Sequence, residues 1–201
     1  MKPIIIVCVI LAWLYVLRVL RKAKLHAWRF FWGSLGLFVI LMIVIQPVLT
    51  QPLASAVSAL AGVIGNLTGA FTAYFRYGII FIASAAGSIT LQVDFECSGI
   101  IEIMAFLSLL TFFNVYTRSE KIIVGISGFL YIMLCNTLRI VLICMSVHLF
   151  GTSAYYIVHT YVGRIFFYLL SILLYFYVFT KPQIIKMKVG NFAYGSDKTN
   201  S

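Results

Sequence analysis

The sequence predicts an all-α polytopic membrane protein with about five transmembrane helices, a re-entrant or interfacial helix and a short extracytoplasmic β-hairpin. Two features of the composition lead to this class: 63% of the 201 residues are hydrophobic and only 10% are charged, whereas a soluble domain carries roughly 25% charged residues. The third observation is that long apolar runs alternate with short basic segments. The formal net charge of +10 therefore indicates membrane topology, and no nucleic-acid partner is predicted.

Five apolar runs approach or exceed the length needed to cross a bilayer. The first, residues 4–17, is followed by basic residues and lacks a small-residue cleavage site, so we interpret it as a retained span and not a signal peptide. The second, residues 30–45, ends at Gln46-Pro47, where proline favours a turn out of the helix. The other three runs cover residues 98–115, 122–149 and 160–180.

The distribution of basic residues orients these spans by the positive-inside rule. The segment after the first span, the link before the fourth span and the C-terminal tail together hold 11 of the 15 Lys and Arg residues. We therefore place these three segments in the cytoplasm, with the N-terminus outside and the C-terminus inside. Cys97 then lies at the outer end of the third span.

Residues 50–94 fall on the outer side in this scheme. Residues 53–71 are apolar but rich in small residues, and both of their ends lie outside, which favours a re-entrant or interfacial helix over a full span. Residues 79–84 and 89–94 flank Ala85-Ala-Gly-Ser88, and β-branched residues around a glycine-containing turn predict a hairpin. Because open strand edges cannot face lipid, we expect this hairpin outside the hydrocarbon core.

The whole chain, residues 1–201, is expected to form a single integral membrane domain. Its predicted parts follow the order of the spans. They are an N-terminal helix pair (1–49), an extracytoplasmic re-entrant and hairpin region (50–96), the catalytic helices (97–180) and a cytoplasmic tail (181–201).

Three residues with catalytic chemistry fall on one level of three different predicted helices. Cys97 begins the third span beside Glu96. Arg139 lies about 27 Å beyond the cytoplasmic Lys121 at ~1.5 Å per helical residue, near the outer boundary, and a charge inside a span indicates function by default. His159 precedes the fifth span on the outer side. A cysteine near its ordinary pKa of about 8.5 needs such a cation or histidine to become a nucleophile.

Other candidates have weaker positions. His148 also lies near the outer end of its span and is the fallback for His159. Glu102, one turn inside its span, would pair with Arg139 or take part in chemistry. Arg164 is interpreted as an interfacial arginine whose side chain snorkels to the membrane surface. The remaining cysteines fit small packing residues: Cys8, Cys135 and Cys144. No Cys or His spacing typical of zinc is present, so neither a metal nor a cofactor is predicted.

Three segments together resemble the exosortase and archaeosortase family in order and approximate spacing. They are Glu96-Cys-Ser-Gly-Ile100, Asn136-Thr-Leu-Arg-Ile140, and His159-Thr-Tyr-Val-Gly163 with the following Arg-Ile-Phe-Phe167. Members are multi-pass membrane cysteine enzymes proposed to act as transpeptidases. The resemblance covers about residues 53–180. It implies Cys97 as nucleophile, Arg139 as charge stabiliser and His159 as acid/base partner. The supporting residues are Asn136, Ser98 and Gly99.

The resemblance further implies a short bacterial form, in the plasma membrane, with its active site on the extracytoplasmic side. The expected partners are an exported protein with a C-terminal apolar span and a basic cluster, and a lipid or polymer acceptor. Two other classes stay open on the residues alone: a small transporter or channel subunit, and a non-catalytic scaffold for surface polymer export. The chain shows no internal repeat of the kind that transporters often carry.

Overall fold

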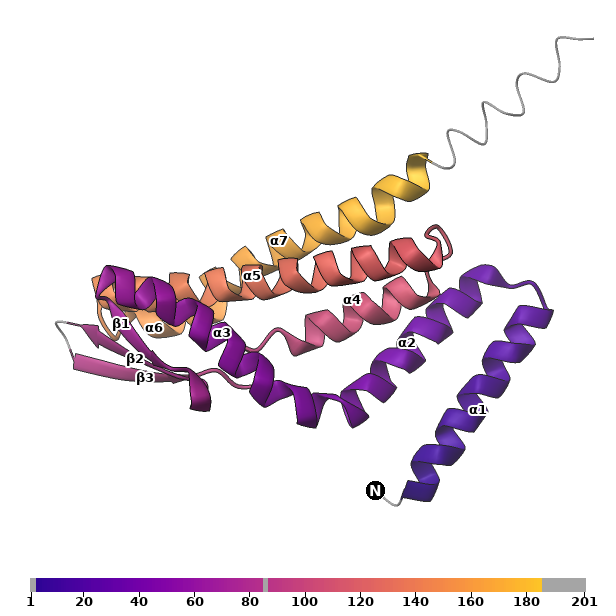
Figure 1. Cartoon of the computed structure of the whole chain (residues 1–201), viewed down its shortest axis with the longest axis horizontal. Helices are drawn as coiled ribbons and strands as arrows, with labels where there is room; N and C mark the ends of the chain where they lie inside the picture. Colours follow the sequence, from indigo (N-terminus) through magenta and orange to yellow (C-terminus); the bar gives the residue numbers. More distant parts are fainter. Residues whose placement is uncertain (1–2, 85–86, 186–201) are drawn as a thin grey trace, which may run out of the picture.

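The computed structural model describes residues 3–84 and 87–185, which are mostly helical and include one small antiparallel sheet. Most of the helices lie roughly along one long axis (Figure 1). The sheet lies at one end, called here the sheet end. The connections at residues 23–25 and 113–117, and the helix that ends the described chain, lie at the other. We call this the basic end, because Arg21, Lys22, Arg118 and Lys181 gather there.

All five predicted spans are helical. They correspond to α1 (Pro3–Lys22), α2 (His26–Val44), α4 (Ile100–Phe112), α5 (Arg118–Phe150) and the continuous helix Ala154–Ile185. Four described helices are long and apolar enough to cross a membrane: α2, α3 (Gln46–Thr68), α5 and Ala154–Ile185. This supports a multi-pass membrane protein. Among the described residues, α3 joins the helices with the properties of a span, whereas the predicted spans at α1 and α4 are helical but are not among these four.

The junction between α2 and α3 differs from its prediction. Only Ile45 separates the two helices, and Pro47 lies in the first turn of α3, where its missing N–H costs no helical hydrogen bond. Pro47 therefore begins a helix instead of turning the chain out of one. From this kink α3 continues toward the sheet end (Figure 1).

The predicted hairpin is confirmed and belongs to a three-stranded sheet. Strands β1 (Phe71–Tyr74), β2 (Ile79–Ser84) and β3 (Gly87–Gln92) pair antiparallel in that order, and residues 85–86 of the predicted turn lie outside the described residues. Strand β1 was not predicted. Its neighbour β2 places Ile80 and Ile82 on the buried face, which packs mainly against α3 and α5. The opposite face carries Tyr74 and Phe81 and is exposed.

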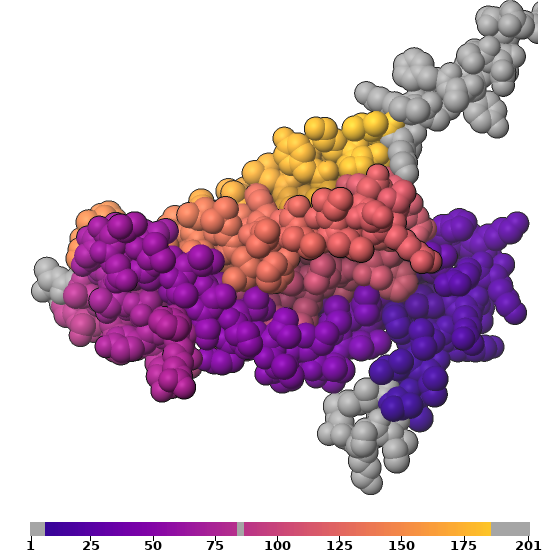
Figure 2. All heavy atoms as spheres, in the orientation of Figure 1, coloured from indigo at the N-terminus to yellow at the C-terminus, as the bar shows by residue number. Residues whose placement is uncertain are grey.

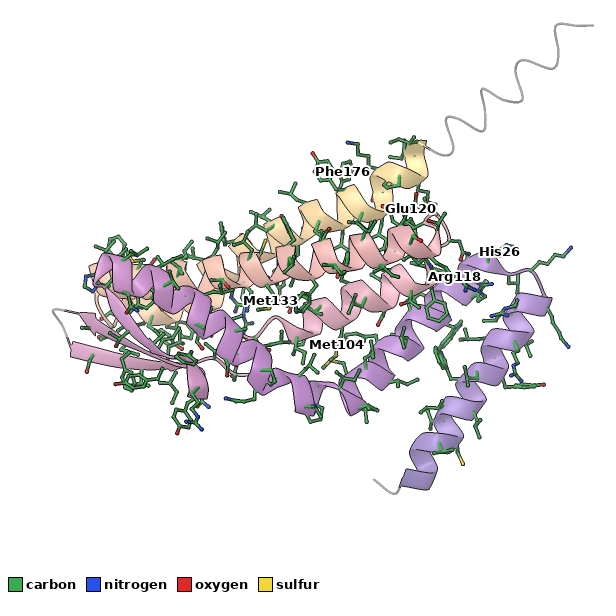
Figure 3. All side chains as sticks on the ribbon, in the orientation of Figure 1. His26, Met104, Arg118, Glu120, Met133 and Phe176 are labelled. Atoms are coloured by element: carbon green, nitrogen blue, oxygen red, sulfur yellow. The ribbon has the colours of Figure 1, made fainter. Side chains whose placement is uncertain are left out.

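Helix α5 is the central element of the bundle. Thr117 and Glu120 begin it with a reciprocal capping box, and its 33 residues give a length of about 50 Å at ~1.5 Å per residue. It contacts α4 and the last helix on the way to the sheet, where it meets α3. Met104 and Met133 lie buried within the bundle, whereas His26 and Arg118 mark the basic end (Figure 3).

The last helix begins earlier than predicted and contains two π-helical segments. It consists of α6 (Ala154–Ile157), the π segment η2 (Val158–Val162), α7 (Gly163–Tyr175) and the π segment η3 (Phe176–Thr180). A π turn disturbs the regular hydrogen-bond ladder and is frequent at functional sites. In η3 the hydroxyl of Tyr116 donates a hydrogen bond of 2.7 Å to the carbonyl of Val178, which ties this segment to the rest of the bundle.

Candidate active site

The loop that joins β3 to α4 carries Cys97 between the sheet and the helical bundle. Its first residue, Val93, donates its N–H to the carbonyl of Gly78 at 2.7 Å. This hydrogen bond continues the pairing of β2 with β3 by one residue beyond the Ile79–Gln92 pair. The N–H of Cys97 then points back to Asp94, 3.1 Å from the carboxylate Oδ1 and 3.2 Å from the main-chain carbonyl. This turn fixes the backbone of Cys97. Ser98 adds a hydrogen bond of 2.9 Å from its hydroxyl to the carbonyl of Phe95.

Asn136 and Gly99 hold the other side of the loop. The side chain of Asn136 is fully buried and donates from Nδ2 to the carbonyl of Cys97 at 2.6 Å. Gly99 caps the start of α4 with a φ of +76°, a left-handed conformation that favours glycine. Any Cβ at Gly99 would also lie 3.4 Å from the Asn136 side chain. Asn136 therefore positions the backbone of the cysteine.

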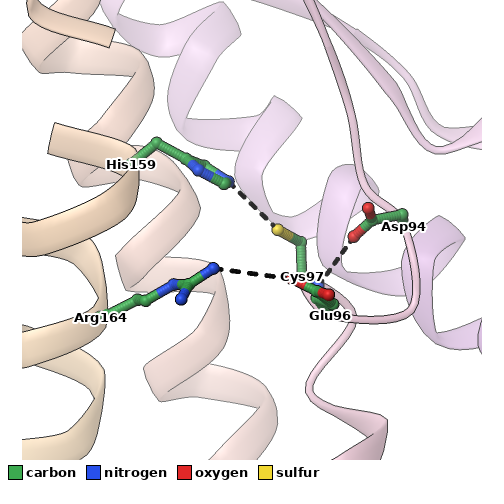
Figure 4. A network of polar contacts seen from close by, with 5 residues as sticks. All are labelled: Asp94, Glu96, Cys97, His159 and Arg164. Atoms are coloured by element: carbon green, nitrogen blue, oxygen red, sulfur yellow. Dashed lines mark hydrogen bonds and ion pairs between the residues drawn. The ribbon is translucent and has the colours of Figure 1, made fainter. Parts of the chain in front are cut away.

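His159, on η2, is the histidine that meets the cysteine. Its Nε2 lies 3.4 Å from the Sγ of Cys97 (Figure 4), a distance suited to proton transfer between thiol and imidazole. Tyr155, one turn earlier, stacks on the imidazole with 5.2 Å between ring centroids and an interplanar angle of 22°. The fallback candidate His148 lies elsewhere, with its Nδ1 2.6 Å from the carbonyl of Ala83 in the sheet.

Arg139 is a buried cation beside this pair. Its side chain is 95% buried, with a relative exposure of 5%, and its guanidinium lies 5.8 Å from the centroid of the Phe167 ring, in the range of a cation–π contact. The Nε of Arg139 has no hydrogen-bond partner among the described residues. Glu102 and Arg139 line a common cavity of about 280 Å³, but no ion pair joins them in the described part of the chain.

An ion pair crosses the same cavity between the cysteine loop and the last helix. Arg164 Nη2 lies 3.6 Å from Glu96 Oε2, and both side chains are about half exposed. Arg164, interpreted from the sequence as a snorkelling arginine, also lines the cavity and faces the residue next to Cys97 (Figure 4). Exposed ion pairs contribute only about 0–1 kcal/mol, so this pair adds little to the stability of the fold.

The electrostatic surroundings keep the cysteine protonated near neutral pH. Burial raises the pKa of the Cys97 thiol to about 11, the positive charge of Arg139 opposes this increase, and the carboxylates of Asp94 and Glu96 add to it. The resting site therefore holds a thiol beside an imidazole. A proton acceptor is needed during attack, and the Nε2 of His159 is within reach.

Two contacts of this site were not anticipated from the sequence. Asp94 lies three residues before Cys97, a spacing at which an aspartate side chain commonly closes a turn onto a following N–H. Tyr155 lies one helical turn before His159, where two rings on one face can stack. Both signals are short-range patterns that recur in many unrelated chains, and only the fold shows that one contacts Cys97 and the other contacts His159.

A multi-pass membrane bundle in which a buried thiol meets an imidazole, next to a polar cavity lined by a buried guanidinium, defines a candidate membrane cysteine enzyme. Residues 2–177 match the family model described as transmembrane exosortase. The chain therefore belongs to the transmembrane exosortase family, and this confirms the resemblance of its three segments. Membership supports a membrane transpeptidase or protease in general terms. No curated protein and no solved structure matches the chain.

Proposed function

We propose that this protein is a membrane-embedded cysteine transpeptidase that cleaves the C-terminal sorting signal of exported proteins through an acyl-enzyme on Cys97. The observation that carries the proposal is the 3.4 Å contact between Cys97 Sγ and His159 Nε2. These residues are 62 positions apart in sequence and belong to two of the three family-like segments. A thiol placed against an imidazole is the arrangement that nucleophilic cysteine chemistry requires.

The first half of the reaction forms a thioester. The sulfur of Cys97 attacks the carbonyl carbon of the scissile peptide bond while Nε2 of His159 accepts the thiol proton, which gives a tetrahedral intermediate with a negatively charged oxygen. As the C–N bond breaks, the imidazolium of His159 returns that proton to the leaving amine. The C-terminal tail of the substrate departs with its new amino group, and the rest of the exported protein stays bound to Cys97.

The second half transfers the acyl group to an acceptor. An amine or hydroxyl of a lipid or polymer attacks the thioester carbonyl and gives its proton to His159, and the C–S bond breaks. The proton then passes to the sulfur of Cys97, so the free thiol is restored. Water in place of the acceptor would give hydrolysis by the same steps.

Arg139 is proposed to stabilise the negative charge that develops in both halves. It is buried, and its Nε lacks a partner among the described residues, so a donor is available to an anionic oxygen without breaking a protein hydrogen bond. Fixed donors of this kind in a poorly solvated site are often the largest single contribution to acyl transfer. Asn136 acts through the Cys97 carbonyl and is a positioning residue.

The proposed substrate is an exported protein whose C-terminal apolar span is followed by a basic cluster. The span would lie in the bilayer beside the bundle, the scissile bond would reach Cys97 at the extracytoplasmic side, and the basic cluster would stay in the cytoplasm with the basic end. This arrangement follows the positive-inside rule for both proteins. It predicts that the enzyme's own C-terminus is cytoplasmic.

The test is cleavage of an exported protein that is encoded beside this chain and carries such a tail. Cys97→Ala should leave the substrate uncut, whereas a variant with Cys8, Cys135 and Cys144 all changed to Ala should process it. The wild-type reaction should also yield a covalent adduct that hydroxylamine releases, as expected of a thioester. Normal cleavage by Cys97→Ala at normal expression would exclude Cys97 as nucleophile and favour the transporter or scaffold alternatives.

A further inference from the structure

Two helices independently define a band without charged residues. On α5 no charge occurs between Lys121 and Arg139, 18 residues later, a rise of about 27 Å at ~1.5 Å per residue. On the last helix no charged residue occurs between Arg164 and Lys181, which are 17 residues apart. This corresponds to about 26 Å at the same rise of ~1.5 Å per residue. Both lengths approach the hydrocarbon thickness of about 30 Å. One boundary of this band therefore lies at the level of the candidate site.

A group of exposed aromatic residues lies where β1 turns into β2. The short helix η1 (Phe75–Tyr77) makes this turn, and we call residues 74–77 the aromatic corner. Tyr74, Phe75 and Tyr77 are 61%, 60% and 63% exposed, and Arg76 between them is exposed as well. Tyr74 also meets the exposed ring of Phe81 edge to face at 5.4 Å. Three large rings and a cation thus face away from the protein at one place.

The aromatic corner is close to the candidate site along the axis of the molecule. Gly78, the residue after the corner, accepts the hydrogen bond from Val93, four residues before Cys97. Gln51, near the start of α3, donates to the carbonyl of Arg76 at 3.3 Å. Figure 1 shows the corner at the end of the sheet nearer the bundle, and Figure 2 shows the same segment projecting from the molecular outline. The corner therefore lies near the boundary of the charge-free band.

We propose that the aromatic corner is a membrane-interface anchor that inserts its rings into the phospholipid headgroup layer at the sheet end. Tyrosine suits this layer because its apolar ring can lie against lipid while its hydroxyl stays hydrated, and phenylalanine adds an apolar ring that can insert beside it. Arg76 supplies a donor for a lipid phosphate. Without lipid, three large rings would be exposed to water on the same corner, and exposed apolar groups of this kind mark an interaction surface.

The anchor has a consequence for the site because the two are joined by short, hydrogen-bonded backbone. Gly78, directly after the aromatic corner, accepts a backbone hydrogen bond from Val93 at the start of the cysteine loop. The depth of the corner in the headgroup layer therefore sets the depth of the loop. The inference concerns the lipid surface and does not depend on the chemistry proposed for Cys97.

Depth-dependent fluorescence quenching tests the proposal. The natural tryptophans Trp13, Trp28 and Trp32 are changed to Phe, and Phe75→Trp then supplies one reporter in vesicles of phosphatidylcholine and phosphatidylglycerol. We expect at least a twofold loss of fluorescence with lipids brominated at carbons 6 and 7, and a smaller loss with bromines at carbons 11 and 12. Leu67→Trp, at an 82% exposed position in the last turn of α3 at the sheet end, is the matched control and should show little quenching.

An unquenched Phe75→Trp, or equal quenching of both reporters, would overturn the anchor. A second measurement needs no substitution: the wild-type chain is irradiated in nanodiscs with a phospholipid that carries a diazirine near its headgroup. Mass spectrometry should find lipid adducts on residues 74–77. Absence of adducts there, with adducts on the exposed face of α7 as the internal control, would refute lipid contact and favour a protein or polymer partner.

Discussion

The pH dependence of Cys97 alkylation tests how the nucleophile is activated. Burial raises the pKa of this thiol to about 11, so about one thiol in 10,000 is ionised at pH 7, compared with about 3% for an ordinary cysteine. Because the thiolate is the reactive form, the alkylation rate should rise about tenfold per pH unit from pH 7 to pH 10. Limited access to the buried sulfur would slow the reaction at every pH and leave this slope unchanged.

The assay uses iodoacetamide on the variant with the other three cysteines changed to Ala, in nanodiscs, with the adduct measured by mass spectrometry. Two substitutions of opposite sign accompany it. Arg139→Gln removes the charge that lowers the pKa and should slow alkylation at each pH, whereas Asp94→Asn removes one that raises it and should speed alkylation. A plateau of the wild-type rate below pH 8 would show a preformed thiolate and refute the reasoning.

Four further outcomes are expected. Reporters fused after residues 24, 119 and 190 should be cytoplasmic and one inserted at Gly87 extracytoplasmic; a cytoplasmic Gly87 reporter would exclude the proposed orientation. Arg139→Lys should lose most substrate cleavage, since lysine lacks the planar set of donors, and full cleavage would leave Arg139 a structural role only. Asn136→Ala should cost about 1–3 kcal/mol, because the Cys97 carbonyl loses its buried partner; an unchanged thermal midpoint in detergent would contradict this. His148→Ala should retain cleavage, and its complete loss would reopen the choice of base.

The sequence predicted the helices that form long apolar runs and the strands that flank a clear glycine-containing turn. The five long apolar runs are all helical, and the predicted hairpin strand at residues 89–94 overlaps β3, whose Leu91 is buried. Strand β1 was missed because its first residue, Phe71, falls within the apolar run 53–71, and four residues are too few for their alternation to stand out. Pro47 was misinterpreted for a related reason: proline marks both a helix end and a helix start, and only the neighbouring contacts decide between them.

The site could be predicted as residue types and not as contacts. Cys97, Arg139 and His159 were named from their segments and their level along the helices, and the structure brings Cys97 and His159 into contact, with Arg139 lining the neighbouring cavity. The sequence offered no distance with which to separate His148 from His159, since both lie near the outer ends of their spans. The difference arises in η2, which turns His159 toward the sulfur, while α5 directs His148 to the strand at Ala83.

The π segment that carries His159 makes the site sensitive to the number of residues as well as their identity. A π turn contains about one residue more than an α turn, and each residue of an α-helix advances by about 100°. Deleting one residue within 158–162 would convert the π turn into a regular α turn, which leaves the flanking helical parts nearly in place but changes the direction of the side chains within the turn, His159 among them. Among relatives, the spacing between His159 and Arg164 should therefore be free of gaps even where the intervening side chains differ.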